Sequence, residues 1–294
     1  MSAESLLKKL IRGDILVADG ATGTNLQIMG LPVGAAAERW VLENPNAVFK
    51  LNQAFIDAGA EILLTCTFGG TRIRLRASDL EDNFKAINLK AIEISHSAVD
   101  GRDILVAGSI GPTGHMLAPL GDITPEEAEA DFEAQARLMC EGGVDLIVIE
   151  TQFDLNEAQA AVGGVRKITT DLPVVCSFSF DRGTRTMMGV TPKDVALAMN
   201  DLKVDILGIN CGRSPDDNLA ALKQLREETT KPIWFKPNAG MPETDENGKP
   251  TYSLQPEAMG ALVPLWLAAG AQIIGGCCGT SPEHLAAVAK AVHA

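Results

Sequence analysis

The sequence predicts a single-domain α/β protein of the (β/α)8 (TIM) barrel class, and three observations support this prediction. Eight short apolar or β-branched runs alternate with segments of helical periodicity along the 294 residues. Each run is apolar nearly throughout, as expected of parallel strands that are covered on both faces. Polar and sulfur-bearing residues gather where the runs end, and this is the face that carries the active site in such barrels.

The eight strand candidates leave room for a helix after each of them. Between them lie helical patterns such as Val48, Leu51, Phe55 and Ala58. A doubly wound open sheet uses the same alternation and is the alternative fold. We expect one domain over residues 1–294, because no low-complexity tract or linker divides the chain. The strand candidates are residues 15–18, 61–67, 104–110, 146–151, 174–180, 206–210, 233–236 and 272–275.

Four of the expected helices have well-specified starts. In each, a hydroxyl side chain that can cap the helix precedes a proline at the first helical position. We therefore expect helices to begin at these four places. The pairs are Thr124-Pro125, Thr191-Pro192, Ser214-Pro215 and Ser281-Pro282.

Composition excludes several classes of function. Hydrophobic residues make up 46% of the chain and charged residues 21%, which is typical of a packed globular domain. The formal net charge of −13 repels phosphate backbones and anionic lipid, and aromatic residues are only 4%. We expect neither a nucleic acid nor a membrane as partner.

One uncharged stretch, residues 258–282, is long enough in principle to span a bilayer. It contains Pro264, Gln272 and five glycines, so a helix over 257–269 followed by a buried strand explains it better. The N-terminal residues offer no apolar signal segment. Six cysteines without such a signal indicate a reducing compartment, and we expect a cytoplasmic protein.

Three cysteines stand at the ends of predicted strands. Cys277 and Cys278 lie between glycines after the eighth strand, and Cys211 follows the sixth. Those two strands flank the seventh, so the three sulfurs can converge about 2.3 Å from one zinc ion and leave a fourth position for substrate. The alternative is that all three are small buried hydrophobes. We expect Cys140, within a helix, and Cys176, within a strand, to be core residues.

Two acidic residues also stand at strand ends. Asp19 ends the first strand and precedes Gly20 and Ala21 in a turn rich in backbone N–H groups, which can hold a carboxylate. Glu150 ends the fourth strand after an apolar run, so its charge needs a cationic partner. Together the two acids suit a substrate ammonium group, although each can instead cap a helix or pair with a neighbouring base. With the cysteines, they describe an amino-acid pocket beside a thiol-activating metal.

These residues resemble the zinc-dependent homocysteine S-methyltransferase family, and the resemblance covers nearly the whole chain. Within the family, the chain is most similar to the homocysteine-binding barrel of the cobalamin-dependent methionine synthase branch. The motifs that carry the resemblance are Asp19-Gly20-Ala21-Thr22-Gly23-Thr24, Thr65-Cys66-Thr67-Phe68, Gly111-Pro112-Thr113, Ile149-Glu150-Thr151, Asn210-Cys211, Lys236-Pro237-Asn238-Ala239-Gly240 and Gly275-Gly276-Cys277-Cys278-Gly279-Thr280.

The resemblance assigns a role to each matched residue. It implies that Cys211, Cys277 and Cys278 ligate zinc and that Asp19 and Glu150 receive the amino group of homocysteine. The backbone N–H groups of Gly20 and Ala21 would take the carboxylate of homocysteine. The resemblance also implies that Asn238 can occupy the fourth zinc position before substrate arrives.

The sequence departs from the family at two places. The opening motif usually has a second glycine where this chain has Ala21, whose methyl group stands where the backbone approaches the substrate. Many relatives have an asparagine where this chain has Cys66, at a position expected to border the pocket. The departures leave the zinc ligands intact and bear on the identity of the thiol substrate.

The implied reaction moves a methyl group from a methylcorrinoid, carried on a separate corrinoid protein, to the zinc-bound thiolate of homocysteine, giving methionine. Use of S-methylmethionine or betaine as donor is an alternative, and so is demethylation that loads a corrinoid protein. A non-catalytic, zinc-stabilised binding barrel is a further alternative. An aldolase-like barrel is disfavoured, because Lys236, followed by Pro237, is the sole Schiff-base candidate.

Overall fold

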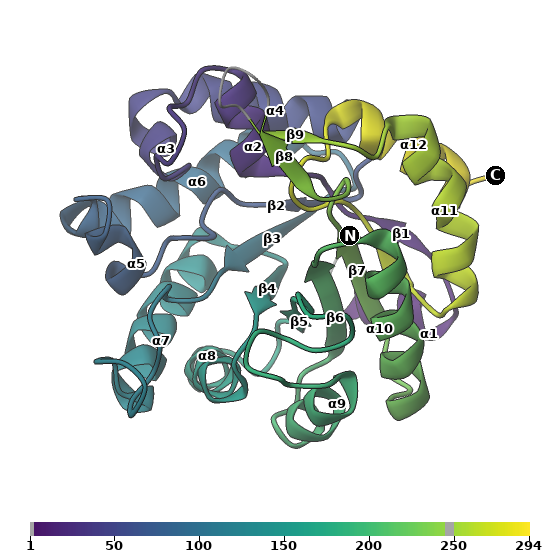
Figure 1. Ribbon diagram of the computed structural model, residues 1–294. Coiled ribbons are helices and arrows are strands. Elements are labelled where there is room, and N and C mark those ends of the chain that lie inside the picture. Colours follow the sequence, from purple (N-terminus) through teal and green to yellow (C-terminus); the bar gives the residue numbers. More distant parts are fainter. Residues whose placement is uncertain (1–2, 245–249) are drawn as a thin grey trace.

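The computed structural model, which describes residues 3–244 and 250–294, is a closed barrel of eight parallel strands surrounded by helices (Figure 1). The strands follow one another around the barrel in chain order, apart from the small pair β8 and β9. Their bounds are β1 (Leu16–Val17), β2 (Ile62–Leu64), β3 (Leu105–Ile110), β4 (Leu146–Gln152), β5 (Val174–Phe178), β6 (Ile206–Cys211), β7 (Ile233–Pro237) and β10 (Ile273–Ile274).

The barrel closes between β1 and β2. Ala18 forms a parallel bridge with Ile62, and the Asp19 N–H donates to the Ile62 carbonyl at 3.0 Å. At the other side of β1, Leu16 and Val17 pair with β10. This closure confirms the predicted barrel and excludes the doubly wound open sheet.

Helices follow the strands on the outside of the barrel, and all four predicted starts are confirmed. Thr124, Thr191 and Ser214 each accept a hydrogen bond from a backbone N–H of the helix that they cap, and Ser281 precedes the last helix. The helices are α1 (Ala3–Ile11), α2 (Thr22–Ile28), α3 (Arg39–Glu43), α4 (Pro45–Asp57), α5 (Arg72–Arg76), α6 (Phe84–Val99), α7 (Pro125–Gly142), α8 (Leu155–Ile168), α9 (Pro192–Asp201), α10 (Pro215–Glu228), α11 (Pro256–Ala268) and α12 (Pro282–Val292), with a 3-10 turn η1 (Glu81–Asn83).

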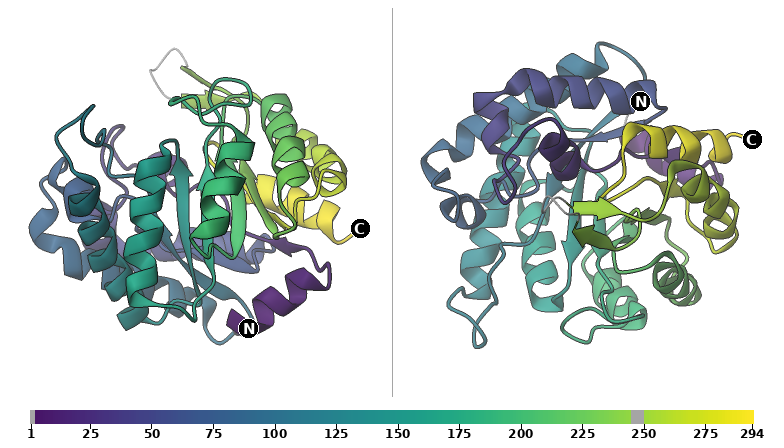
Figure 2. Two further views of the ribbon diagram at one scale, coloured as in Figure 1. Left: turned by 90° about the horizontal axis from the view of Figure 1, so that it is seen from below. Right: turned by 45° about the horizontal axis from the view of Figure 1, so that its top comes forward.

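The core has two main layers. The larger lies between the strands and the surrounding helices, and a smaller cluster fills the barrel interior with residues such as Ile62, Val148 and Trp234. Leu6 and Leu10 of α1 belong to the interior cluster, so α1 closes the N-terminal end of the barrel (Figure 2). The opposite end is left as the open mouth, as expected for this fold.

Two features differ from the prediction. β1, β2 and β10 are shorter than the apolar runs that mark them, although backbone hydrogen bonds, such as that from the Gly275 N–H to the Phe235 carbonyl, continue past the last strand residue. An antiparallel pair, β8 (Pro242–Thr244) and β9 (Pro250–Tyr252), was not predicted. Its Tyr252 ring packs against Gly279, where a Cβ atom would lie 2.2 Å from the ring. The pair therefore covers the loop that contains Cys277 and Cys278.

The uncharged stretch forms α11 and β10, as expected. Within residues 3–244 and 250–294, no helix has the length and apolar character needed to cross a membrane.

Candidate active site

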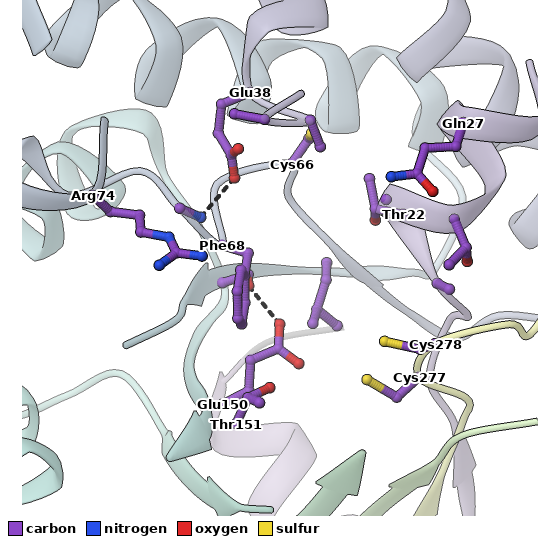
Figure 3. A pocket seen from close by; sticks show the side chains of 18 of the residues that line it. Thr22, Gln27, Glu38, Cys66, Phe68, Arg74, Glu150, Thr151, Cys277 and Cys278 are labelled. Atoms are coloured by element: carbon purple, nitrogen blue, oxygen red, sulfur yellow. Dashed lines mark hydrogen bonds between the residues drawn. The ribbon is translucent and has the colours of Figure 1, made fainter. Parts of the chain in front are cut away.

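A cavity of about 690 Å³ opens at the C-terminal ends of the strands (Figure 3). Its wall includes residues at the C-terminal ends of β4, β6 and β7 and residues that follow β1, β2 and β10, so it lies where the sequence places the chemistry. The cavity brings together Glu150, Cys211, Cys277, Cys278 and Lys236.

The three predicted metal ligands converge. The Sγ atom of Cys211 lies 2.9 Å from that of Cys277 and 4.0 Å from that of Cys278. All three sulfurs lie within 4.8 Å of one another. Two sulfurs on one tetrahedral zinc ion are about 3.8 Å apart when each bond is about 2.3 Å. The observed spacing brackets this value, so the three side chains fit zinc.

The local backbone explains how adjacent cysteines can face the same way. Cys211, the last residue of β6, has a φ of +57°, which turns its side chain out of the strand's alternation. After β10, Gly276 packs so closely that a Cβ atom would lie 2.4 Å from Thr280, and Gly279 has a φ of +80°. The glycines thus permit the irregular turn that aims Cys277 and Cys278 into the cavity.

Without a cation, the triad favours one negative charge at most. Hydrogen bonds from Cys211 and Cys277 lower the pKa of Cys278 to about 4. The hydrogen bond with Cys211 lowers the pKa of Cys277, but the contact with Cys278 and burial outweigh it and raise this pKa to about 12. Hydrogen bonds with Cys277 and Cys278, together with burial, raise the pKa of Cys211 well above its usual value. Three buried thiolates therefore require a positive ion among them, which is a further reason why this donor set fits a metal.

Asp19 is buried and already has partners within the protein. Its Oδ1 atom accepts a hydrogen bond from Lys236 Nζ at 2.5 Å, and its Oδ2 atom accepts the Leu64 N–H at 2.8 Å. Burial opposes the charge on Lys236, but the carboxylates of Asp19 and Glu150 outweigh it and raise the pKa of Lys236. Lys236 is therefore a cation held between two acids.

Glu150 faces the cavity, and its side chain is 8% exposed. Ser109 Oγ donates to its Oε1 atom at 2.6 Å (Figure 3). Burial raises the pKa of Glu150 to about 7, against the opposing effect of Lys236. A cationic substrate group beside this carboxylate would lower its pKa and stabilise the ionised form.

The turn after β1 lines the cavity next to the sulfurs. Gly20 must be a glycine, because a Cβ atom there would lie 2.5 Å from the Phe55 ring. The Ala21 N–H donates to Thr280 Oγ1 at 3.1 Å, so an incoming carboxylate would share or displace this contact. Ala21 precedes α2 and gives it no side-chain cap, which leaves the first N–H groups of that helix open to an anionic ligand. The predicted roles of Gly20 and Ala21 remain predictions.

Asn238 follows β7, and its backbone N–H contacts the Cys211 carbonyl at 3.4 Å. Its Nδ2 donates to the Gly212 carbonyl at 2.8 Å. Its Oδ1 atom is buried without a hydrogen-bond partner among the described residues. Such an orphaned acceptor beside the cysteine loops fits the predicted ability to bind a metal.

The remaining cysteines are only partly as predicted. Cys66 lines the cavity as expected, and burial raises the pKa of its thiol well above the usual value. Cys176 lies in the core, but Cys140 on α7 is partly exposed, so its prediction as a core residue was wrong. The sequence reasoning did not assign site roles to Ser109 or Asn210, and it weighed Lys236 only as a Schiff base.

The chain is similar to known methyltransferases over nearly its whole length. The family model described as Homocysteine S-methyltransferase matches residues 16–292. The chain is 30% identical to methionine synthase from Mycobacterium tuberculosis and 29% identical to that from Mycobacterium leprae, over 95% of this chain and 24% of each relative. The chain thus spans about a quarter of the length of these curated relatives.

Among solved structures, the chain resembles the homocysteine methyltransferase MmuM from Escherichia coli. The metallated form superposes with a TM-score of 0.82 and 26% identity, over 97% of this chain and 99% of that one. The apo form gives 0.75 and the oxidized form 0.76. The backbone therefore agrees best with the metallated of these three forms.

Proposed function

The chain belongs to the homocysteine S-methyltransferase family, and we propose that a methylcorrinoid on a separate protein supplies the methyl group that it transfers to homocysteine. The product is methionine. The observation that carries the proposal is the convergence of three cysteine sulfurs, all within 4.8 Å of one another, beside a buried carboxylate in one cavity.

We propose that Cys211, Cys277 and Cys278 hold zinc, with Asn238 as a fourth ligand when no substrate is present. When bound, zinc lowers the pKa of a substrate thiol and holds it as a nucleophilic thiolate. The agreement with the metallated bacterial homocysteine methyltransferase supports this assignment.

The chain's own residues orient the substrate. Glu150 receives the ammonium group of homocysteine by direct contact, and Asp19 adds a second negative charge, which it shares with Lys236. The backbone at Gly20 and Ala21 receives the substrate carboxylate. Holding both ends of the amino acid fixes the direction in which the thiol side chain reaches the cysteines.

We assign no general base on the protein, because a zinc ion held by the three cysteines would lower the thiol pKa enough for water to take the proton. A sulfur lone pair then forms the bond to the methyl carbon. The bond between that carbon and its carrier breaks at the same time, and its electron pair stays on the carrier. The barrel mouth must admit the carrier on the far side of the methyl group.

Two observations favour a corrinoid over an onium donor. The methionine synthases from the two mycobacteria match almost the whole chain. Phe68 is the only aromatic residue among the described residues that line the cavity, whereas a quaternary ammonium or sulfonium donor is typically recognised by several aromatic rings. S-methylmethionine and betaine remain the alternative donors, with reverse transfer and a non-catalytic zinc barrel as further alternatives.

The decisive experiment is homocysteine-dependent demethylation of methylcobalamin, followed by its absorption spectrum with and without a zinc chelator. We expect slow, chelator-sensitive turnover of the free cofactor and faster turnover on a corrinoid protein, because docking of the carrier aligns the reacting atoms. Ready methionine formation from S-methylmethionine or betaine, with methylcobalamin untouched, would overturn the corrinoid assignment. Zinc binding without transfer from any donor would favour the non-catalytic barrel.

A further inference from the structure

The side chain of Asn210 contacts both Thr151, which is next to Glu150, and the proposed metal ligand Cys277. Asn210 is the penultimate residue of β6 and is fully buried. Its side chain reaches β5 through Ser177, β4 through Thr151 and the loop after β10 through Cys277. One amide thus touches the strand that carries Glu150 and the loop that carries two of the cysteines.

The amide uses all of its hydrogen-bonding capacity in these contacts. Asn210 Oδ1 accepts the Thr151 N–H at 2.9 Å and the Ser177 hydroxyl at 2.6 Å. Asn210 Nδ2 donates to Thr151 Oγ1 at 2.7 Å and contacts Cys277 Sγ at 3.8 Å. A backbone N–H can only donate, so the oxygen must face Thr151 N, and this fixes the nitrogen toward the sulfur.

Thr151 is held in an unfavourable backbone conformation. Its φ is +61°, a region that a β-branched residue avoids, and two of the four Asn210 contacts go to this residue. The register between β4 and β5 shifts at the same place, with two residues of β4 opposite one of β5 between the pairs Ile149–Cys176 and Gln152–Phe178.

This irregularity has a consequence for the site. Successive residues of a regular strand point to opposite faces, yet Glu150 and Thr151 both line the cavity. The left-handed turn at Thr151 therefore belongs to the arrangement that presents Glu150 to a ligand. Ser109 holds the carboxylate itself, whereas Asn210 holds the backbone beside it.

We propose that Asn210 is a positioning residue that sets the geometry between Glu150, which receives the substrate ammonium, and the Cys277 sulfur. It does so by holding Thr151 in the left-handed conformation and by directing an N–H group at Cys277. The inference rests on the proposed function for the identity of the ligand. The geometry of residue 151 does not depend on that function.

The test uses the rescue of one variant by another. In Asn210→Ala, we expect homocysteine to bind zinc-loaded protein at least about tenfold more weakly by calorimetry, because Thr151 relaxes and Glu150 moves. Glycine adopts a positive φ without strain, so Asn210→Ala with Thr151→Gly should regain most of that affinity. Zinc affinity, measured by chelator competition, should fall about tenfold in both variants, because the contact with Cys277 is lost in each.

Ser177→Ala is the matched control, since it removes a hydrogen bond to the same amide without touching the site. It should change neither the homocysteine affinity nor the zinc affinity by more than about twofold. If Asn210→Ala fails to fold, Asn210→Asp replaces it. The carboxylate still accepts the Thr151 N–H, and the Thr151 hydroxyl can rotate to donate to its second oxygen. Only the donor to Cys277 is then lost, and only zinc affinity should fall. Unchanged homocysteine affinity in Asn210→Ala, or a loss that Thr151→Gly does not repair, would overturn the proposal.

A crystal structure of Asn210→Ala separates this proposal from the proposed function. Residue 151 at a negative φ, with Glu150 displaced, supports the positioning role even if wild-type protein binds no homocysteine. An unchanged φ at residue 151 rejects that role even if the protein proves to be an active methyltransferase.

Discussion

At the residue scale, the two buried carboxyl groups of Asp19 and Glu150 lie near one buried lysine, Lys236. Asp19 and Lys236 neutralise one another at 2.5 Å, which leaves Glu150 as the carboxyl group without a directly bonded cation. Its raised pKa of about 7 is what burial of an unpaired acid produces. The pocket is therefore prepared for one additional positive charge, and homocysteine carries one as its ammonium group.

We expect homocysteine affinity to rise as the pH increases through about 7, because Glu150 ionises there and only the ionised form attracts the ammonium group. Glu150→Gln should abolish this rise and weaken binding by roughly 1.5–3 kcal/mol. Calorimetry against pH measures both effects. A simple alkyl thiol lacks the ammonium group and is the control for titration of the sulfur. An equal pH dependence for the two thiols would contradict the role given to Glu150.

Breaking the Asp19–Lys236 pair should be costly. Lys236→Met leaves the Asp19 carboxylate buried without its cation, so we expect a loss of about 3–5 kcal/mol in the free energy of unfolding. Asp19→Asn combined with Lys236→Met should recover part of that loss, because no unpaired charge remains. Denaturant unfolding of the two variants measures the difference. A double variant as unstable as Lys236→Met would show that the loss is one of packing rather than of charge.

The same residues show what could be read from the sequence. Cys211, Cys277 and Cys278 could be predicted because their setting between glycines and at strand ends is a local property. The partners of Lys236 and Asn210 could not, since those contacts join strands far apart in the chain. A signal did exist at Lys236, which is the only charge within the apolar run of β7 and therefore needs a buried acid.

At the element scale, prediction worked where local chemistry determines the structure. The hydroxyl and proline pairs located four helix starts, because a cap and a fixed φ act within a few residues. Strand ends were less predictable, since the extent of regular pairing depends on the neighbouring strands, which are distant in the sequence. The β8 and β9 pair lacks an apolar alternation, so nothing in its sequence marked it as strand.

Replacement of serine by alanine should therefore have different effects at a helix cap and on an exposed helix surface. Ser214→Ala removes the side chain that accepts the Asp217 N–H at the start of α10, and should lower the free energy of unfolding by about 1 kcal/mol. Ser97→Ala, the same change on the exposed part of α6, should be neutral or slightly stabilising, because alanine has the higher helix propensity. Paired denaturant unfolding curves measure both. Equal effects at the two sites would contradict the capping role of Ser214.

At the scale of the whole molecule, the apolar core and the three proposed metal ligands are separate sets of residues. The two main core clusters contain Cys66 and Cys176, but they contain none of the three proposed ligands. The ligands stand at the mouth, with Cys211 at the end of β6 and the other two on the loop after β10, while α1 closes the other end of the barrel. The barrel is thus a rigid frame whose mouth can change its ligands without loss of the core.

This separation predicts that loss of the metal leaves the fold intact. A small zinc domain unfolds without its ion, but here the two main core clusters contain none of the three cysteines. We expect chelated protein, and the Cys277→Ala Cys278→Ala variant, to keep the far-ultraviolet circular dichroism of the wild type. Metal analysis should find about one zinc per chain in wild type and in Cys140→Ala, and none in the double variant.

The metal should still stabilise the folded state by mass action. Zinc at a thousandfold excess over its dissociation constant adds about 4 kcal/mol to the free energy of unfolding. The melting temperature of wild type and of Cys140→Ala should therefore rise with added zinc, whereas that of the double variant should not move. Collapse of the circular dichroism on chelation would show that the triad is needed for folding, and full zinc content in the double variant would show that the metal is bound elsewhere.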